Sequence, residues 1–187
     1  LSSLMNYIQR AVPADDEYYF AFKYEPVGGD FHSLSVLALY AGSTLLVQVR
    51  RLATTGYLAA YRGTTQIQAA TTKPVLVSGG IRLIEARVKI HDTAGVVQVK
   101  VDGEMVIDFS GDTKPGTDTQ INMFTLGAAG SGNYGYAYYD DFIVDDADWI
   151  GNTKIQAILP NAAGSSTQWD PSAGNNYDCV DERPASD

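Results

Sequence analysis

The acidic residues of the predicted strands lack one spacing that is used to hydrolyse glycosides. Glycoside hydrolysis uses two carboxyl groups on either side of a sugar, and side chains two residues apart share one face of a strand. The strand-like stretch of residues 81–109 has Glu85, Glu104 and Asp108 but no Glu-x-Asp-x-Glu series. We therefore do not expect a glycosidase.

Nucleophilic catalysis and cofactor chemistry also lack their usual residues. Cys179 is the only cysteine, which excludes an internal disulfide, and it lies far in the sequence from His32 and His91, the two histidines. A small buried apolar side chain is its simplest interpretation. Residues 127–132 read GAAGSG and lack the Lys-Ser/Thr ending of a phosphate loop. These observations predict a protein that is not an enzyme and that has no cofactor.

One pair of carboxylates could bind a cation. Asp140 and Asp141 are followed by Asp145, Asp146 and Asp148, and calcium takes oxygen ligands of this type. The spacing fits no loop with a fixed ligand order. The alternative is that one Asp of the pair binds backbone amides, and we expect no metal site.

Aromatic and amide side chains form the best candidate ligand site. Sugar recognition stacks an apolar ring face on Tyr or Trp, while Asn or Asp binds the hydroxyl groups. The candidates are Asn133, Tyr134, Tyr136, Tyr57 and Tyr61. The alternative is that these tyrosines fill a core or an interface, with their hydroxyls reaching water.

Charge is distributed unevenly along the 187 residues. The net charge is −9. Residues 1–139 have 11 basic and 12 acidic side chains, and residues 140–187 have 2 and 10. A body with no basic stripe is a poor partner for nucleic acid, and no apolar run approaches the ~18 residues of a membrane span. We expect neither nucleic-acid binding nor membrane insertion.

Most of the chain alternates between apolar and polar residues with a period of two, which is typical of half-buried strands. This pattern predicts strands at residues 18–24, 45–49, 84–90, 97–101 and 105–109. Shorter ones are expected at residues 33–40, 56–61, 65–69, 119–126 and 136–144. Residues 6–11 fit a strand better than the helix that Leu1, Leu4, Met5 and Ile8 also allow.

A turn signal joins two of these strands. Asp102-Gly103 separates the alternating runs at 97–101 and 105–109, and this dipeptide favours the type I′ turn of a β-hairpin. About ten short strands without a convincing helix predict an all-β fold, an antiparallel sandwich of two sheets.

The composition changes after Trp149. Residues 154–159 suit one more strand, and residues 160–184 are rich in Asn, Ala, Gly, Ser and Asp with little periodicity. We therefore expect a sandwich over residues 1–149, followed at 150–187 by an extended arm or the start of a further domain. Trp169 and Tyr177 are the residues of this segment that we expect to contact a neighbouring subunit, because an exposed large ring is costly.

Two motifs of the body resemble the laminin-G-like, or concanavalin-A-like, jelly-roll modules. These motifs are Val101-Asp102-Gly103, in the hairpin turn, and Tyr139-Asp140-Asp141-Phe142, in the last strand. The strand INMFTLG supports the likeness, which covers roughly residues 5–145. The resemblance implies a jelly-roll sandwich.

The C-terminal segment resembles one that follows such modules in structural proteins of tailed bacteriophages. The matching residues are Pro160, Gly164, Trp169, Pro171, Asn176, Tyr177, Val180, Asp181, Glu182 and Pro184, whereas Asn152 departs from the usual Asp. The resemblance implies a virion component, such as a capsid decoration protein, a head fibre or a tail-fibre module. It also implies a natural chain that continues past Asp187.

These likenesses lead to two functional hypotheses. The first is a virion structural protein that assembles with other virion proteins and with its own copies, a trimer being the usual form. It would be made in the host cytoplasm and exposed on the particle surface. The second is a lectin-like module that binds a glycan on the host surface.

Overall fold

The computed structural model describes residues 7–27, 33–76, 79–127 and 136–153. These residues form eleven strands in two antiparallel sheets, as the alternating pattern predicts. The chain divides into one unit over residues 1–153 and a second over residues 154–187, which lies outside the described residues. The expected arm or domain and the strand expected at 154–159 are therefore not described.

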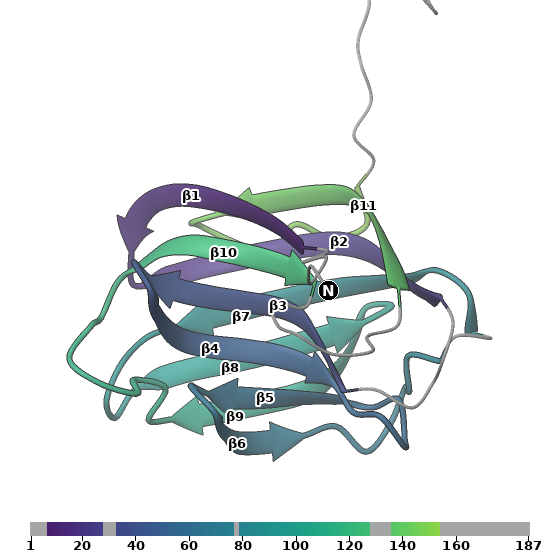
Figure 1. The fold of residues 1–187 in the computed structure, drawn as a ribbon, viewed down its shortest axis with the longest axis horizontal. Coiled ribbons are helices and arrows are strands. Elements are labelled where there is room, and N and C mark those ends of the chain that lie inside the picture. Colours follow the sequence, from purple (N-terminus) through teal and green to yellow (C-terminus); the bar gives the residue numbers. More distant parts are fainter. Residues whose placement is uncertain (1–6, 28–32, 77–78, 128–135, 154–187) are drawn as a thin grey trace, which may run out of the picture. The chain divides into compact units, whose positions relative to one another are not determined.

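One sheet has six strands in the order β1-β10-β3-β4-β5-β6 (Figure 1). They are β1 (Tyr7–Asp15), β10 (Ile121–Gly127), β3 (Leu34–Ala41), β4 (Thr44–Arg51), β5 (Leu58–Arg62) and β6 (Thr65–Ala69). The edge strand β1 confirms the strand expected near residues 6–11. It passes through Pro13, which an edge strand tolerates because its missing N–H needs no partner there.

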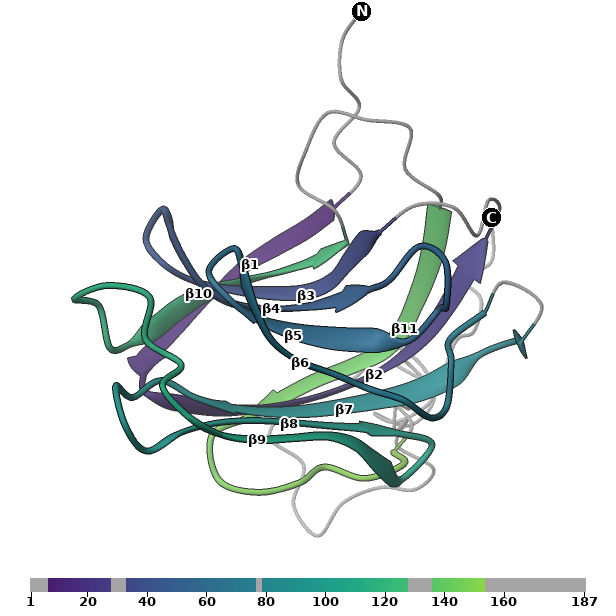
Figure 2. The same ribbon diagram turned by 90° about the horizontal axis from the view of Figure 1, so that it is seen from below.

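The second sheet has five strands in the order β11-β2-β7-β8-β9. They are β11 (Tyr136–Asp145), β2 (Glu17–Val27), β7 (Arg82–Lys89), β8 (Gly95–Val101) and β9 (Glu104–Gly111). Figure 2 shows the two sheets as stacked layers whose strands bend toward the same side. The outer face of the six-stranded sheet is the concave one.

The hairpin between β8 and β9 forms at Asp102-Gly103, as predicted. Both residues have positive φ, 52° and 81°, which a type I′ turn requires. The Asp102 carboxylate accepts hydrogen bonds from the Leu83 amide at 3.0 Å and from Arg82 at 2.8 Å. This turn is therefore fixed to the neighbouring strand β7 as well as by its own geometry.

Aromatic rings from both sheets meet between the layers. Phe124 of β10 stacks on Phe142 of β11 with ring centroids 4.8 Å apart, and Phe20 of β2 contacts both rings. Such pairs add about 0.5–1.5 kcal/mol each beyond the burial of their area. The inward phase of the alternating strands thus joins the two sheets through one apolar core.

The interior also holds a charged side chain. Arg51 is fully buried, and its Nε donates to the Val75 carbonyl at 2.6 Å. Burial raises the pKa of Tyr24 to about 12, and the charge of Arg51 opposes that rise. Burial also raises the pKa of Tyr139 well above its ordinary value, and its hydroxyl donates to the Val36 carbonyl at 3.2 Å. Tyr24 and Tyr139 therefore serve as core residues, and neither is among the candidate ligand residues.

Candidate functional site

The strand register places one row of side chains across the outside of the six-stranded sheet. We call this surface the six-strand face. Its central row, in order of pairing, is Gln9, Thr125, Ala38, Gln48, Tyr61 and Gln66. The adjacent row is Ser35, Arg50, Ala59 and Ala69.

Alternation along β4 explains why these side chains point outward. Val47 and Val49 belong to the core cluster, so Gln48 and Arg50 fall on the opposite side of the sheet. Ala38 and Ala59 are buried but lie outside the core cluster, as expected for small residues between larger outward neighbours.

Tyr61 lies at the centre of a polar group on this face. Its hydroxyl donates to Oε1 of Gln66 at 3.0 Å. The guanidinium carbon of Arg50 lies 5.1 Å from the centre of the Tyr61 ring, a cation–π distance. The Gln48 amide donates to the Gly63 carbonyl at 2.8 Å, in the turn between β5 and β6. Three strands therefore hold one aromatic ring, one cation and two amides together.

Among the residues that the structure describes, two hydroxyl groups of the six-strand face have no hydrogen-bond partner. They are Oγ of Ser35 and Oγ1 of Thr125, and both atoms are buried. Thr125 as a whole is only 3% exposed. Buried polar atoms are nearly always paired, and an exception calls for an explanation.

Arg50 is the charged residue of the two rows. Within the described part of the chain it forms no ion pair and no hydrogen bond, and its recorded contact is the Tyr61 ring. The guanidinium therefore retains its five N–H donors for another partner.

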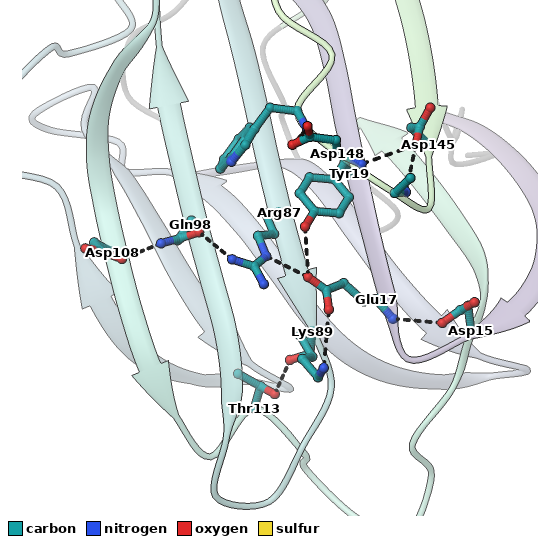
Figure 3. A network of polar contacts seen from close by, with 12 residues as sticks. Asp15, Glu17, Tyr19, Arg87, Lys89, Gln98, Asp108, Thr113, Asp145 and Asp148 are labelled. Atoms are coloured by element: carbon teal, nitrogen blue, oxygen red, sulfur yellow. Dashed lines mark hydrogen bonds and ion pairs between the residues drawn. The ribbon is translucent and has the colours of Figure 1, made fainter.

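The outside of the five-stranded sheet has a different character, and we call it the five-strand face. Its residues are Glu17, Tyr19, Glu85, Arg87, Lys89, Gln98, Lys100 and Asp108. Figure 3 shows that six of them, Glu17, Tyr19, Arg87, Lys89, Gln98 and Asp108, form one network of polar contacts. Glu17 accepts from Arg87 at 2.6 Å, from Tyr19 at 3.1 Å and from Lys89 at 3.3 Å, and Gln98 links Arg87 to Asp108.

This network lowers the pKa of Glu17. Burial alone would raise the pKa of the carboxyl group. The hydrogen bonds from Arg87, Tyr19 and Lys89, with the charge of Arg87, outweigh burial and lower the pKa below its ordinary value of 4.5. Glu17 is thus held in its ionised form.

The chain after β11 packs on the five-strand face. The ring centre of Trp149 lies 3.6 Å from Nζ of Lys100 and 5.8 Å from the ring centre of Tyr19. The Gly151 amide donates to Glu85, which is 4% exposed, at 3.0 Å. The five-strand face is therefore both internally paired and partly covered. The boundary expected at 149/150 falls within this packed segment.

The residues predicted to bind a ligand do not gather at one site among the described residues. Tyr61 lies on the six-strand face, whereas Tyr57 precedes β5 and packs against the core cluster. Tyr136 begins β11 opposite Val27, and its side chain is not described. Asn133 and Tyr134 lie outside the described residues, so this loop stays a prediction. The amides and the cation beside Tyr61 were missed, although the alternation at residues 45–49 marks Gln48 and Arg50 as outward residues.

The carboxylates of Asp140 and Asp141, the calcium candidates, bind other groups of the chain. Asp141 forms an ion pair with Lys23 at 2.5 Å, and the Asp140 carboxylate accepts from the Asp141 amide. Among the described residues, no three His, Cys, Asp or Glu side chains gather as a metal site. That same part of the chain has no helix of the length and hydropathy of a membrane span. Trp169 and Tyr177 are not described.

Comparison with known proteins identifies the fold. No protein-family model and no curated protein sequence matches the chain. Among solved structures, an alginate lyase with bound alginate tetrasaccharide has a TM-score of 0.56 at 15% identity, over 76% of this chain and 75% of its own. A tetrameric galectin from the ball sponge Cinachyrella sp. gives 0.53 at 15%, over 74% and 98%. An endo-β-1,4-glucuronan lyase from Trichoderma reesei gives 0.52 at 12%, over 74% and 73%.

These likenesses show the fold alone, and they confirm the jelly-roll sandwich of the concanavalin-A-like kind. They contradict the prediction that the chain is not an enzyme, because lyases are built on the same sandwich. That prediction depended on the missing hydrolase carboxylates, and an elimination reaction does not need such a pair. The compared structures have no stated link to bacteriophages, so the virion role stays a prediction.

Proposed function

We propose that the six-strand face binds a saccharide. The observation that carries this proposal is the group around Tyr61: an aromatic ring flanked by the Gln66 amide and by the Arg50 guanidinium on one curved, outward surface. A sugar presents an apolar ring face to stack on Tyr and hydroxyl groups to bind amides and hydroxyls.

The comparisons support this proposal at the level of the fold. One similar structure is an alginate lyase that holds an alginate tetrasaccharide, and the others are a galectin and a glucuronan lyase. The five-strand face is the weaker candidate, because its polar groups already bind each other and Trp149 packs on it.

The test is saccharide binding by the full chain and by Tyr61→Ala, measured by affinity electrophoresis on polysaccharides and then by calorimetry. We expect the variant to lose at least about tenfold in affinity, since a buried aromatic anchor contributes ~2 kcal/mol or more. Tyr138→Ala is the matched control, because Tyr138 is 67% exposed on β11 of the other sheet. Equal losses in both variants would contradict the proposal.

A lyase activity at the same face is the second candidate, favoured by the Arg50–Tyr61 pair. In β-elimination from a uronate, a base removes the proton on the carbon next to the carboxylate. The bond from the adjacent carbon to the glycosidic oxygen breaks, a carbon–carbon double bond forms, and the leaving oxygen takes up a proton. A tyrosine side chain can act as the base that removes the first proton and as the acid that donates the second. A guanidinium can neutralise the charge of the carboxylate.

Polyuronates incubated with the chain would then gain the ultraviolet absorbance of the conjugated double bond. Tyr61→Phe, which keeps the ring and removes the hydroxyl, should abolish that signal and retain binding. Binding without any such signal would leave saccharide recognition as the function of this face.

The virion role depends on the resemblance of the C-terminal segment. The structure describes neither Trp169 nor Tyr177, and the prediction of symmetric assembly with other virion proteins is separate from the saccharide proposal. A saccharide-binding sandwich carried on a particle would satisfy both.

A further inference from the structure

We infer that the six-strand face selects acidic saccharides, in which uronate carboxylates bind Arg50. This inference rests on the proposed saccharide function and names the class of sugar. Three features of the described residues carry it: the unpaired guanidinium, the uncharged residues around it, and the charge balance of the whole sheet.

The guanidinium of Arg50 is positioned but not paired. Its contact with the Tyr61 ring holds the planar group over the face, while its N–H donors have no acceptor among the described residues. A planar fork of donors matches the two oxygens of a carboxylate, which a single ammonium does not. The ring and the fork together suit a pyranose that has a carboxylate as its substituent.

The neighbours of Arg50 leave this charge uncompensated. Across the strands, its register partners are Ser35 on β3 and Ala59 on β5. The central row beside it consists of uncharged side chains, such as Gln48 and Thr125. A carboxylate in either row would compete for the guanidinium, and both rows lack one. On the five-strand face, in contrast, Arg87 has Glu17 at 2.6 Å.

The charge balance of the strands favours an anion on this side of the molecule. The strands of the six-stranded sheet have four arginines and one aspartate, a net charge of +3. Those of the five-stranded sheet have five basic and eight acidic residues, a net charge of −3. Arg51 is buried and Arg62 pairs with Asp112. Arg10 and Arg50 are therefore the arginines of these strands that can attract an acidic polymer, which the chain's net charge of −9 otherwise repels.

The experiment uses pairs of polysaccharides that differ in the carboxylate. Mannuronan is compared with mannan, glucuronan with glucan, and polygalacturonate with its methyl ester, by affinity electrophoresis and calorimetry at low and high salt. We expect the acidic member of at least one pair to bind about ten- to a hundredfold more tightly, as charge-assisted hydrogen bonds allow. This preference should weaken with added salt.

Three variants separate a direct contact from the general field. Arg50→Gln should remove the preference, and Arg50→Lys should retain only part of it, because lysine keeps the charge without the fork. Arg10→Gln removes the same charge from an exposed position on β1 of the same sheet and should keep the preference. Thermal melting of each variant checks that the fold is retained.

The outcomes distinguish the two proposals. If the neutral member of every pair binds as tightly as the acidic one, or if the preference survives Arg50→Gln, selection by Arg50 is wrong and saccharide binding stands. If no polysaccharide of either class binds, the function proposed for the six-strand face is itself wrong.

Discussion

The outer faces of the two sheets are built from similar alternating strands, but they differ in how far their charged side chains are paired. On the five-strand face, Glu17 binds both Arg87 and Lys89, and Trp149 packs against Tyr19 and Lys100. On the six-strand face, the described residues give Arg50 an aromatic contact but no ion pair, and they give the buried Thr125 hydroxyl no partner. The comparison indicates that the charged groups of the five-strand face stabilise the fold, while Arg50 on the six-strand face keeps its donors for a ligand.

Arginine illustrates the difference most directly. Arg87 lies opposite Gln98 on one side and Tyr19 on the other, and the Glu17 carboxylate reaches it along β2. Arg50 lies between Ser35 and Ala59, and neither can accept its charge. The same residue type is thus an internal ion-pair partner on one sheet and an open donor on the other. Substitutions on the two faces should therefore have different effects.

The largest effect on stability is expected from Trp149→Ala. The change removes the contact with the Tyr19 ring and the cation–π contact with Lys100. Together with lost burial, this should lower the free energy of unfolding by about 2 kcal/mol. Chemical denaturation measures it, and saccharide affinity should stay the same. A loss of affinity comparable to that of Tyr61→Ala would mean that the five-strand face also belongs to the binding site.

A smaller effect, which depends on pH, is expected from Glu17→Gln. The variant should lose about 1 kcal/mol at neutral pH, because two partly exposed ion pairs and one hydrogen bond are weakened. The folded-state pKa of Glu17 is lowered, so its contribution is present above 4.5 and is lost as the pH falls through the lowered value. Denaturation of both proteins from neutral to acidic pH should show their stabilities converging. A gap that stays constant would show that ionisation of Glu17 does not stabilise the fold.

The smallest effect is expected from Thr125→Val, and it has the opposite sign. Valine has the shape of threonine without the unpaired hydroxyl, so the free energy of unfolding should stay equal or rise by up to about 1 kcal/mol. Urea denaturation of the variant beside the natural chain measures the change. A clear loss of stability would show that this hydroxyl is paired in solution, and the two faces would then differ less than described.

Much of the fold was predictable because its signal is local. Alternation identified the strands and their inward residues, such as Phe20 and Phe22, and Asp102-Gly103 identified a hairpin. The buried Arg51 was not foreseen, since its Val75 partner lies 24 residues away. For the site, the sequence pointed to Tyr61 but not to its neighbours. It also suggested that Tyr57 was equivalent to Tyr61, although one packs on the core and the other lies on the outer face.

By itself, the sequence determined which residues form strands and which side of each strand is apolar, because a period of two is a property of neighbouring residues. Apart from the hairpin at Asp102-Gly103, it could not determine which strands pair, and so it could not show that Thr125, Gln48 and Gln66 share one row. Only the tertiary structure brings β10 between β1 and β3, which lie far from it in the sequence. Polar residues point outward on both sheets, and the register between distant strands decides which of them find partners and which stay open to a ligand.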